Sequence, residues 1–186
     1  MSGGGTVRIL GMAGSLRRGS FNAATLRAAQ ELAPTGMTID GFDIAPIPLY
    51  NEDVREQGFP APVEDLRTRI KAADGLLIVT PEYNYSIPGV LKNAIDWASR
   101  PPEQPFDDKP IGLMGASGGT LGTARAQYHL RQCFIFLNGL VMTRPEVMIP
   151  QAHNKFDAAG KLTDQATRDF ITAHLAALMA WVLRLR

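Results

Sequence analysis

A continuous apolar run, GLLIVT at residues 75–80, decides the fold of this chain. It is followed by the loop PEYNYSIPG at residues 81–89 and by a pattern with apolar residues at steps of three and four up to residue 98. The run is typical of a strand covered on both faces, and the pattern is typical of an amphipathic helix. This strand, loop and helix form the repeating unit of a parallel sheet with helices on both faces.

The same alternation extends to both sides of this unit. The expected strands are residues 6–12, 37–42 and 110–116, with a broken last strand at 140–143 and 147–149, and the expected helices are residues 21–32, 63–73, 87–98, 121–137 and 163–183. Residues 45–62 contain four prolines and predict a long surface loop, which in a compact domain is more often functional than idle. Ligands of such sheets bind at the carboxyl ends of the strands, so the loops after the first, third and fourth strands are the candidate site.

Length and composition restrict the function classes. The 186 residues predict a single domain, 1–186, and 19 Lys and Arg against 18 Asp and Glu exclude a broad electrostatic nucleic-acid binder. A lone cysteine, Cys133, excludes a disulfide framework and a CxxC redox centre, and its apolar neighbours predict a small core residue. No apolar segment is long enough for a membrane span and no signal-peptide pattern is present, so we expect a cytoplasmic protein without a membrane partner. Because a single cysteine cannot form a CxxC redox centre, any redox chemistry must come from a bound cofactor.

The loop after the first strand, GSLRRGSFN at residues 14–22, has the composition of a phosphate-binding loop. Its glycines allow close backbone approach, and the helix that follows offers unpaired N–H groups and the positive end of its dipole. Its hydrogen-bond donors are Ser15, Ser20 and Asn22, with Arg17 and Arg18 adding positive charge. It lacks the Gly-Lys-Ser/Thr of a Walker A motif, so a nucleoside triphosphatase is not expected. A plain turn capped by Ser20 is the alternative.

The loop at residues 81–89 combines two tyrosines, an amide, a hydroxyl and two prolines. Such a stiff loop can pack flat against a ring and bond its edge, although it could instead only cover the end of the sheet. GSLRRGSFN at 14–22 and PEYNYSIPGVLKNAIDW at 81–97 together resemble the NADPH-dependent FMN reductase family, and most of all its bacterial chromate and quinone reductase branch. Both motifs stand in the expected order and spacing, and the resemblance covers nearly the whole chain.

The resemblance implies a flavodoxin-like, five-stranded, doubly wound parallel sheet of order 2-1-3-4-5 that binds FMN. It implies an enzyme that passes electrons from NADPH or NADH through the flavin to quinones, chromate or similar small molecules in a ping-pong sequence, as a homodimer or homotetramer. Carried over by position, Ser15, Arg17, Ser20 and Asn22 hold the FMN phosphate, Glu82, Tyr83, Asn84 and Tyr85 frame the ring, and Ser117 lines its other side. Phe21, Pro81 and Gly118 complete the expected cofactor site. No catalytic acid or base is expected, because the cofactor carries the chemistry.

Two other functions remain open from the residues alone. GASGG at residues 115–119 fits the G-x-S-x-G nucleophile elbow, so a serine hydrolase could use Ser117 with Asp157 or Asp164 and His174. The short chain and the apolar helix around His174 count against it. A flavodoxin-type electron carrier is the second alternative, but such carriers are usually strongly acidic, and this chain has a net charge of +1.

Several residues outside the two motifs are candidates for further roles. Arg100, just past a helix end, is expected either to bind an anionic substrate or only to cap that helix. Candidates for polar contacts between subunits are Tyr85, Arg125, Tyr128 and Glu146. No metal site is expected, because His129 and His153 lack a second ligand at metal-binding spacing.

Overall fold

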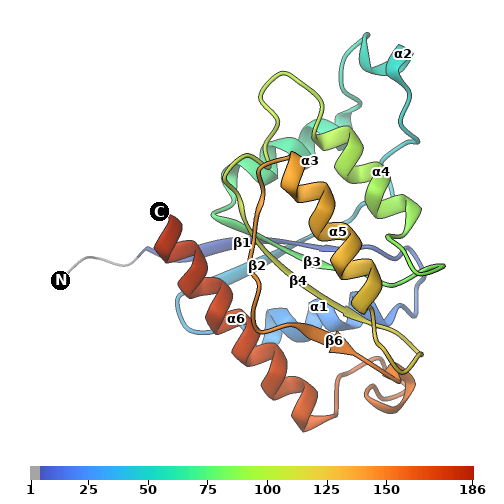
Figure 1. The fold of residues 1–186 in the computed structure, drawn as a ribbon, viewed down its shortest axis with the longest axis vertical. Helices are drawn as coiled ribbons and strands as arrows, with labels where there is room; N and C mark the ends of the chain where they lie inside the picture. The colour runs from blue at the N-terminus through green and yellow to red at the C-terminus, as the bar shows by residue number, and fades with distance from the viewer. Residues whose placement is uncertain (1–4) are drawn as a thin grey trace.

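The fold of residues 5–186, described by a computed structural model, is built around one parallel sheet (Figure 1). The strands run in the order β2-β1-β3-β4-β5, and β6 also pairs with β4. Their bounds are β1 (Val7–Ala13), β2 (Met37–Phe42), β3 (Gly75–Val79), β4 (Pro110–Ala116), β5 (Leu140–Val141) and β6 (Val147–Ile149). The predicted order is confirmed, and the broken last strand consists of β5 against the start of β4 and β6 against its end.

Side chains that alternate along the strands divide the core into two layers. The helices are α1 (Phe21–Glu31), α2 (Glu52–Arg55), α3 (Ala61–Ala72), α4 (Gly89–Ala98), α5 (Ala124–Phe136) and α6 (Gln165–Leu185), with a 3₁₀ turn η1 (Ala152–Asn154). On β1, Val7 and Ile9 belong to the layer that contains residues of α1 and α6, whereas Leu10 and Met12 belong to the layer with residues of α3, α4 and α5. These two groups of helices lie on opposite faces of the sheet (Figure 1). Because both faces are covered, β3 and β4 are buried along their whole lengths, which explains their apolar sequences. None of the helices within residues 5–186 is long and apolar enough to cross a membrane.

Local residues set where the helices beside the site begin. Ser20 caps α1 by accepting hydrogen bonds from the N–H groups of Asn22 and Ala23. Pro88 precedes α4, whose predicted start at residue 87 is therefore two residues early. As a result, α1 and α4 start just after the loops that follow β1 and β3, where the sequence places the site.

The predicted helix at 121–137 begins only at Ala124. Gly122 adopts the left-handed conformation, with φ of 59°, and a Cβ there would lie 2.8 Å from the backbone carbon of Met148. The segment before α5 therefore packs against β6 as a turn. Cys133, expected in the core, is only half-buried, while its neighbour Phe134 is fully buried.

The proline-rich stretch at residues 45–62 is a loop interrupted by α2. The Asn51 side chain caps this short helix by accepting a hydrogen bond from the N–H of Asp53. The loop is tied to α4, because the Pro48 carbonyl accepts hydrogen bonds from Asn93 and Trp97, each at 2.8 Å. No residue between 45 and 62 lines the cavity at the carboxyl ends of β1, β3 and β4, and the expected functional role of this loop stays a prediction.

Candidate functional site

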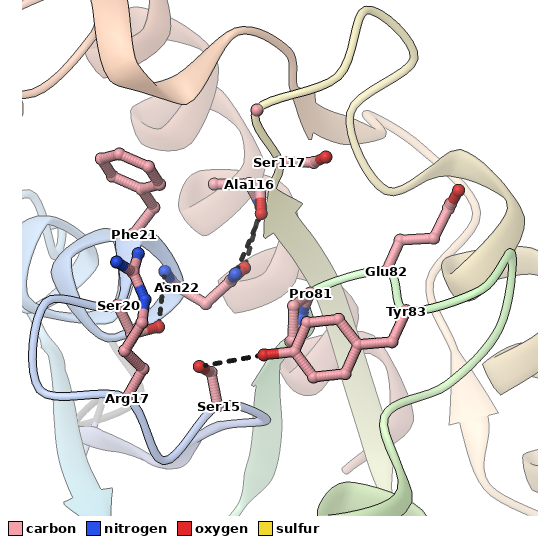
Figure 2. Close-up of a pocket in the computed structure, with 11 residues that line it drawn as sticks. Ser15, Arg17, Ser20, Phe21, Asn22, Pro81, Glu82, Tyr83, Ala116 and Ser117 are labelled. Atoms are coloured by element: carbon pink, nitrogen blue, oxygen red, sulfur yellow. Dashed lines mark hydrogen bonds between the residues drawn. The ribbon is translucent and has the colours of Figure 1, made fainter.

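A cavity of about 290 Å³ opens beyond the carboxyl ends of β1, β3 and β4 (Figure 2). Among its lining residues are these predicted ones: Ser15, Arg17, Ser20, Phe21, Asn22, Pro81, Glu82, Tyr83, Ser117 and Gly118. Ala116, the last residue of β4, also lines it and was not predicted. Its place at the end of a strand that points to the site could have identified it. The position is the one that ligands take in doubly wound sheets.

The loop between β1 and α1 presents a row of free hydrogen-bond donors. Within residues 5–186, the backbone N–H groups of residues 15–19 donate to no protein atom, whereas that of Ser20 donates to the Arg17 carbonyl at 3.0 Å. The start of α1, with the positive end of its dipole, adjoins these groups. The Arg17 guanidinium lies 5.5 Å from the centre of the Phe21 ring, at the edge of the same loop. A phosphate group fits these donors and this charge.

Asn22 joins this loop to β4. Its Nδ2 donates to the Ala116 carbonyl at 2.9 Å, and its Oδ1 accepts from the Ala116 N–H at 2.8 Å (Figure 2). Both partners are buried, so the pair sets the spacing between the first loop and the end of β4. The amide is thus largely occupied by backbone groups, and its contact with a phosphate stays a prediction.

The Glu82 side chain turns from the loop after β3 toward α5. Its carboxylate, 5% exposed, accepts hydrogen bonds from the N–H groups of Arg125 at 3.0 Å and Ala126 at 3.1 Å. It also accepts from Nε of Arg125 at 2.6 Å. A carboxylate at a helix N-terminus is stabilised by the unpaired N–H groups and the dipole there. Glu82 therefore holds α5 against the loop, and only its backbone remains to frame a ring.

The next four residues form a tight turn at the mouth of the cavity. Tyr83 and Ser86 exchange two backbone hydrogen bonds of 3.2 and 3.0 Å, and Asn84 and Tyr85 between them have φ of 50° and 65°. Tyr83 lines the cavity, and its hydroxyl lies 3.4 Å from Oγ of Ser15. Asn84 and Tyr85 do not line it but project from the turn into solvent.

Arg100 is not brought to this cavity within the chain. Its Nε donates to the Asp96 carbonyl at 3.0 Å and its Nη2 to Oγ of Ser99 at 3.2 Å, so it caps the end of α4. The cavity lies at the other end of this helix, about 15 Å away at 1.5 Å per residue. The contacts of Arg100 are thus those of a helix cap, and none of them supports a substrate-binding role.

The geometry contradicts the serine hydrolase. His174 is 1% exposed and faces Gly112, where a Cβ would lie 2.9 Å from its Nε2. Gly112 is five residues before Ser117 on β4, or about 16 Å away along the strand. Asp164 instead pairs with Lys155 and caps α6, and hydrogen bonds from Thr167 and Lys155 lower its pKa to about 2. No triad is therefore assembled around Ser117.

Two residues of α5 touch the site region although the sequence assigned them elsewhere. Arg125, a candidate for subunit contacts, lies with its guanidinium 3.5 Å from the centre of the Tyr85 ring in the same chain. His129, considered only as a metal ligand, places Nδ1 2.8 Å from Oγ of Ser86. Neither contact has a local sequence pattern, because each joins residues about 40 positions apart.

Comparison with known proteins agrees with this geometry. The family model described as NADPH-dependent FMN reductase matches residues 7–154. An NAD(P)H-dependent FMN reductase of Pseudomonas aeruginosa is 59% identical over 180 residues, with 97% of each chain covered, and a quinone reductase of Escherichia coli is 48% identical over 183 residues, also with 97% of each covered. Among solved structures, the flavoenzyme NAD(P)H:(acceptor) oxidoreductase FerB of Paracoccus denitrificans superposes with a TM-score of 0.87 at 35% identity, covering 96% of this chain and 98% of its own. The predicted enzyme class and cofactors, those of a flavin-dependent NAD(P)H oxidoreductase, are thereby confirmed. The chain belongs to the NADPH-dependent FMN reductase family.

Proposed function

We propose that the cavity holds FMN with its phosphate at the free N–H groups of residues 15–19. The ring would then lie between the loop at residues 81–85 and the end of β4, beside Tyr83, the backbone of Glu82 and Ser117, all of which line the cavity. The observation that carries this proposal is the row of free backbone donors beside the start of α1, which is the arrangement that binds a phosphate most readily. Bound FMN supplies hydride transfer from NADPH or NADH to an acceptor.

The mouth of the cavity suits a flat acceptor. Tyr83 lines the cavity and is 50% exposed, so an aromatic side chain stands where a second planar molecule must enter. Tyr85, which is 71% exposed, lies two residues further along the same turn. Quinones are therefore the acceptors that we propose first, and relatives from Escherichia coli and potato carry quinone reductase or quinone oxidoreductase names. Chromate stays a predicted acceptor of the same site. One mouth serves donor and acceptor in turn, which favours a ping-pong sequence.

The protein's part in this reaction is to position the cofactor. Asn22 and Glu82 are both engaged by backbone N–H groups, so they brace the site. Arg125 balances the charge of Glu82. The cations available to a bound phosphate in the first loop are therefore Arg17 and Arg18. Since the cofactor carries the chemistry, we assign no general acid or base.

A homodimer or homotetramer is part of the proposal. On α5, Ile135 is 78% and Phe136 89% exposed, although their neighbour Phe134 is fully buried. Large apolar side chains left in water at the end of a helix suit contact with a second subunit. Tyr128 and Glu146 form a 3.2 Å hydrogen bond within the chain, so their role between subunits stays a prediction. We also propose that residues 1–186 act as one unit in the cytoplasm.

A flavin spectrum of the purified protein tests the function directly. We expect a yellow protein, or an apoprotein that binds added FMN, whose flavin is bleached anaerobically by NADPH or NADH and recovers its colour when benzoquinone is added. A protein that binds no FMN would overturn the proposal. Bound flavin that NADPH and NADH both fail to reduce would point to an electron carrier of the flavodoxin type.

A further inference from the structure

The turn at residues 83–86 adopts a conformation that its sequence does not favour. Two left-handed residues in succession are typical of a type I′ turn, in which asparagine and glycine are preferred. Asn84 suits its position, but Tyr85 at φ of 65° carries a bulky side chain where glycine is usual. In isolation this turn would therefore populate other conformations, and contacts from outside it must hold it in place.

These contacts come from one face of α5. Arg125 stacks its guanidinium on the Tyr85 ring at 3.5 Å and is itself fixed by the buried Glu82 carboxylate. One helical turn further on, Nδ1 of His129 is hydrogen-bonded to Oγ of Ser86 at 2.8 Å. Arg125 and His129 are four residues apart, so they project from the same side of the helix. Tyr85 is thus held by Arg125, and Ser86, which closes the turn, is held by His129.

The same turn is linked to the phosphate loop. Tyr83, its first residue, lines the cavity and places its hydroxyl 3.4 Å from Oγ of Ser15 (Figure 2). A change in the conformation at residues 84–86 would move Tyr83 relative to Ser15 and alter the cavity. The hydrogen bond at Ser86 therefore acts on the cavity through the backbone, without touching a ligand.

We propose that His129 is a positioning residue for the flavin site, which acts through Ser86 by keeping the turn at residues 83–86 in its binding conformation. The inference rests on the proposed FMN site and adds to it a residue that lies outside the cavity. A population shift gives the size of the effect. If only a fraction of molecules holds the turn correctly, the apparent dissociation constant rises by the inverse of that fraction. The loss of one net hydrogen bond corresponds to an increase of about two- to tenfold in this apparent dissociation constant.

The test is titration of the apoprotein with FMN, followed by flavin fluorescence. We expect His129→Ala and Ser86→Ala each to raise the FMN dissociation constant about two- to tenfold, and the double variant to be no weaker than the weaker single variant, because both remove the same bond. His129→Asn retains a hydrogen-bonding group near the position of Nδ1 and should restore most of the affinity. His153→Ala is the matched control, since His153 is exposed on η1 and its ring forms no hydrogen bond within residues 5–186.

The outcomes separate this inference from the proposed function. Wild-type affinity in His129→Ala, additive effects in the double variant, or no rescue by His129→Asn would overturn the positioning role while FMN binding by the parent protein stands. A parent protein that binds no FMN would instead overturn the proposed function. Thermal unfolding of each apoprotein separates a positioning role from a purely structural one. A purely structural contact between His129 and Ser86 would lower the melting temperature and leave the FMN affinity of the folded protein unchanged.

Discussion

Acid should destabilise this protein through His174, a residue remote from the cavity. Burial against β4 lowers its pKa to about 4, although its hydrogen bond to the Pro145 carbonyl opposes this shift and the nearby Arg131 adds to it. Nδ1 lies 2.7 Å from that carbonyl, and Nε2 has no partner within residues 5–186. A second proton on the ring would put a positive charge on a buried group whose Nε2 has no partner in the described part of the chain, so the folded protein favours the neutral imidazole.

The sign and size of the effect follow from linkage. An unfolded histidine has a pKa of about 6.5, so between about pH 6.5 and 4 the unfolded chain binds more protons than the folded one. Stability from this residue is complete above pH 6.5 and is lost as the pH falls. With a folded pKa of about 4, lowering the pH from 8 to 5 removes about 2 kcal/mol from the free energy of unfolding.

Urea unfolding at pH 5, 6, 7 and 8 measures this loss. His174→Asn keeps a donor for the Pro145 carbonyl but does not titrate, so we expect a lower stability at pH 8 and a smaller decrease toward pH 5. His153→Ala, at an exposed histidine, should follow the wild type. If His174→Asn lost as much free energy between pH 8 and 5 as the wild type, the buried imidazole would not be the cause.

Three further substitutions test the framework of the site. Asn22→Ala leaves both backbone groups of Ala116 unpaired and should lower the free energy of unfolding by about 2–4 kcal/mol, measured in urea, and weaken FMN binding. Gly115→Ala places a Cβ 2.1 Å from the carbonyl oxygen that follows β3, so we expect little folded protein by circular dichroism. Glu82→Gln removes the anion that α5 and Arg125 share and should lower the unfolding free energy by about 1–3 kcal/mol, less so in high salt.

Each of these three has an outcome that would contradict it. Wild-type stability in Asn22→Ala would mean that water replaces the amide at β4. A normal melting curve for Gly115→Ala would mean that β3 and β4 separate without penalty. For Glu82→Gln, a loss that is independent of salt would show that shape, not charge, holds α5 to the loop.

The fold was largely predictable because its information is local. Residues 37–42 and 110–116 were predicted as strands with the observed bounds, since period-two alternation and an unbroken apolar run each depend on neighbouring residues alone. The start of α5 was predicted three residues early. Gly122 leaves the helical conformation because it packs against β6, and no pattern around residue 122 contains that contact.

The candidate site was likewise predictable in part. The two loops contain the serines, arginines and aromatic residues that a phosphate and a flat ring require, and they follow strands whose ends meet at one edge of the sheet, so the sequence by itself determined the fold class, the family and most of the cavity lining. Only the tertiary structure decided what those side chains bind within the protein. It turns Glu82 to α5, engages Asn22 with β4, places His129 at Ser86 and leaves Arg100 at the far end of α4. The physical reason is that hydrogen bonds and ion pairs between distant segments form only when packing brings those segments together, and a linear pattern does not record that packing.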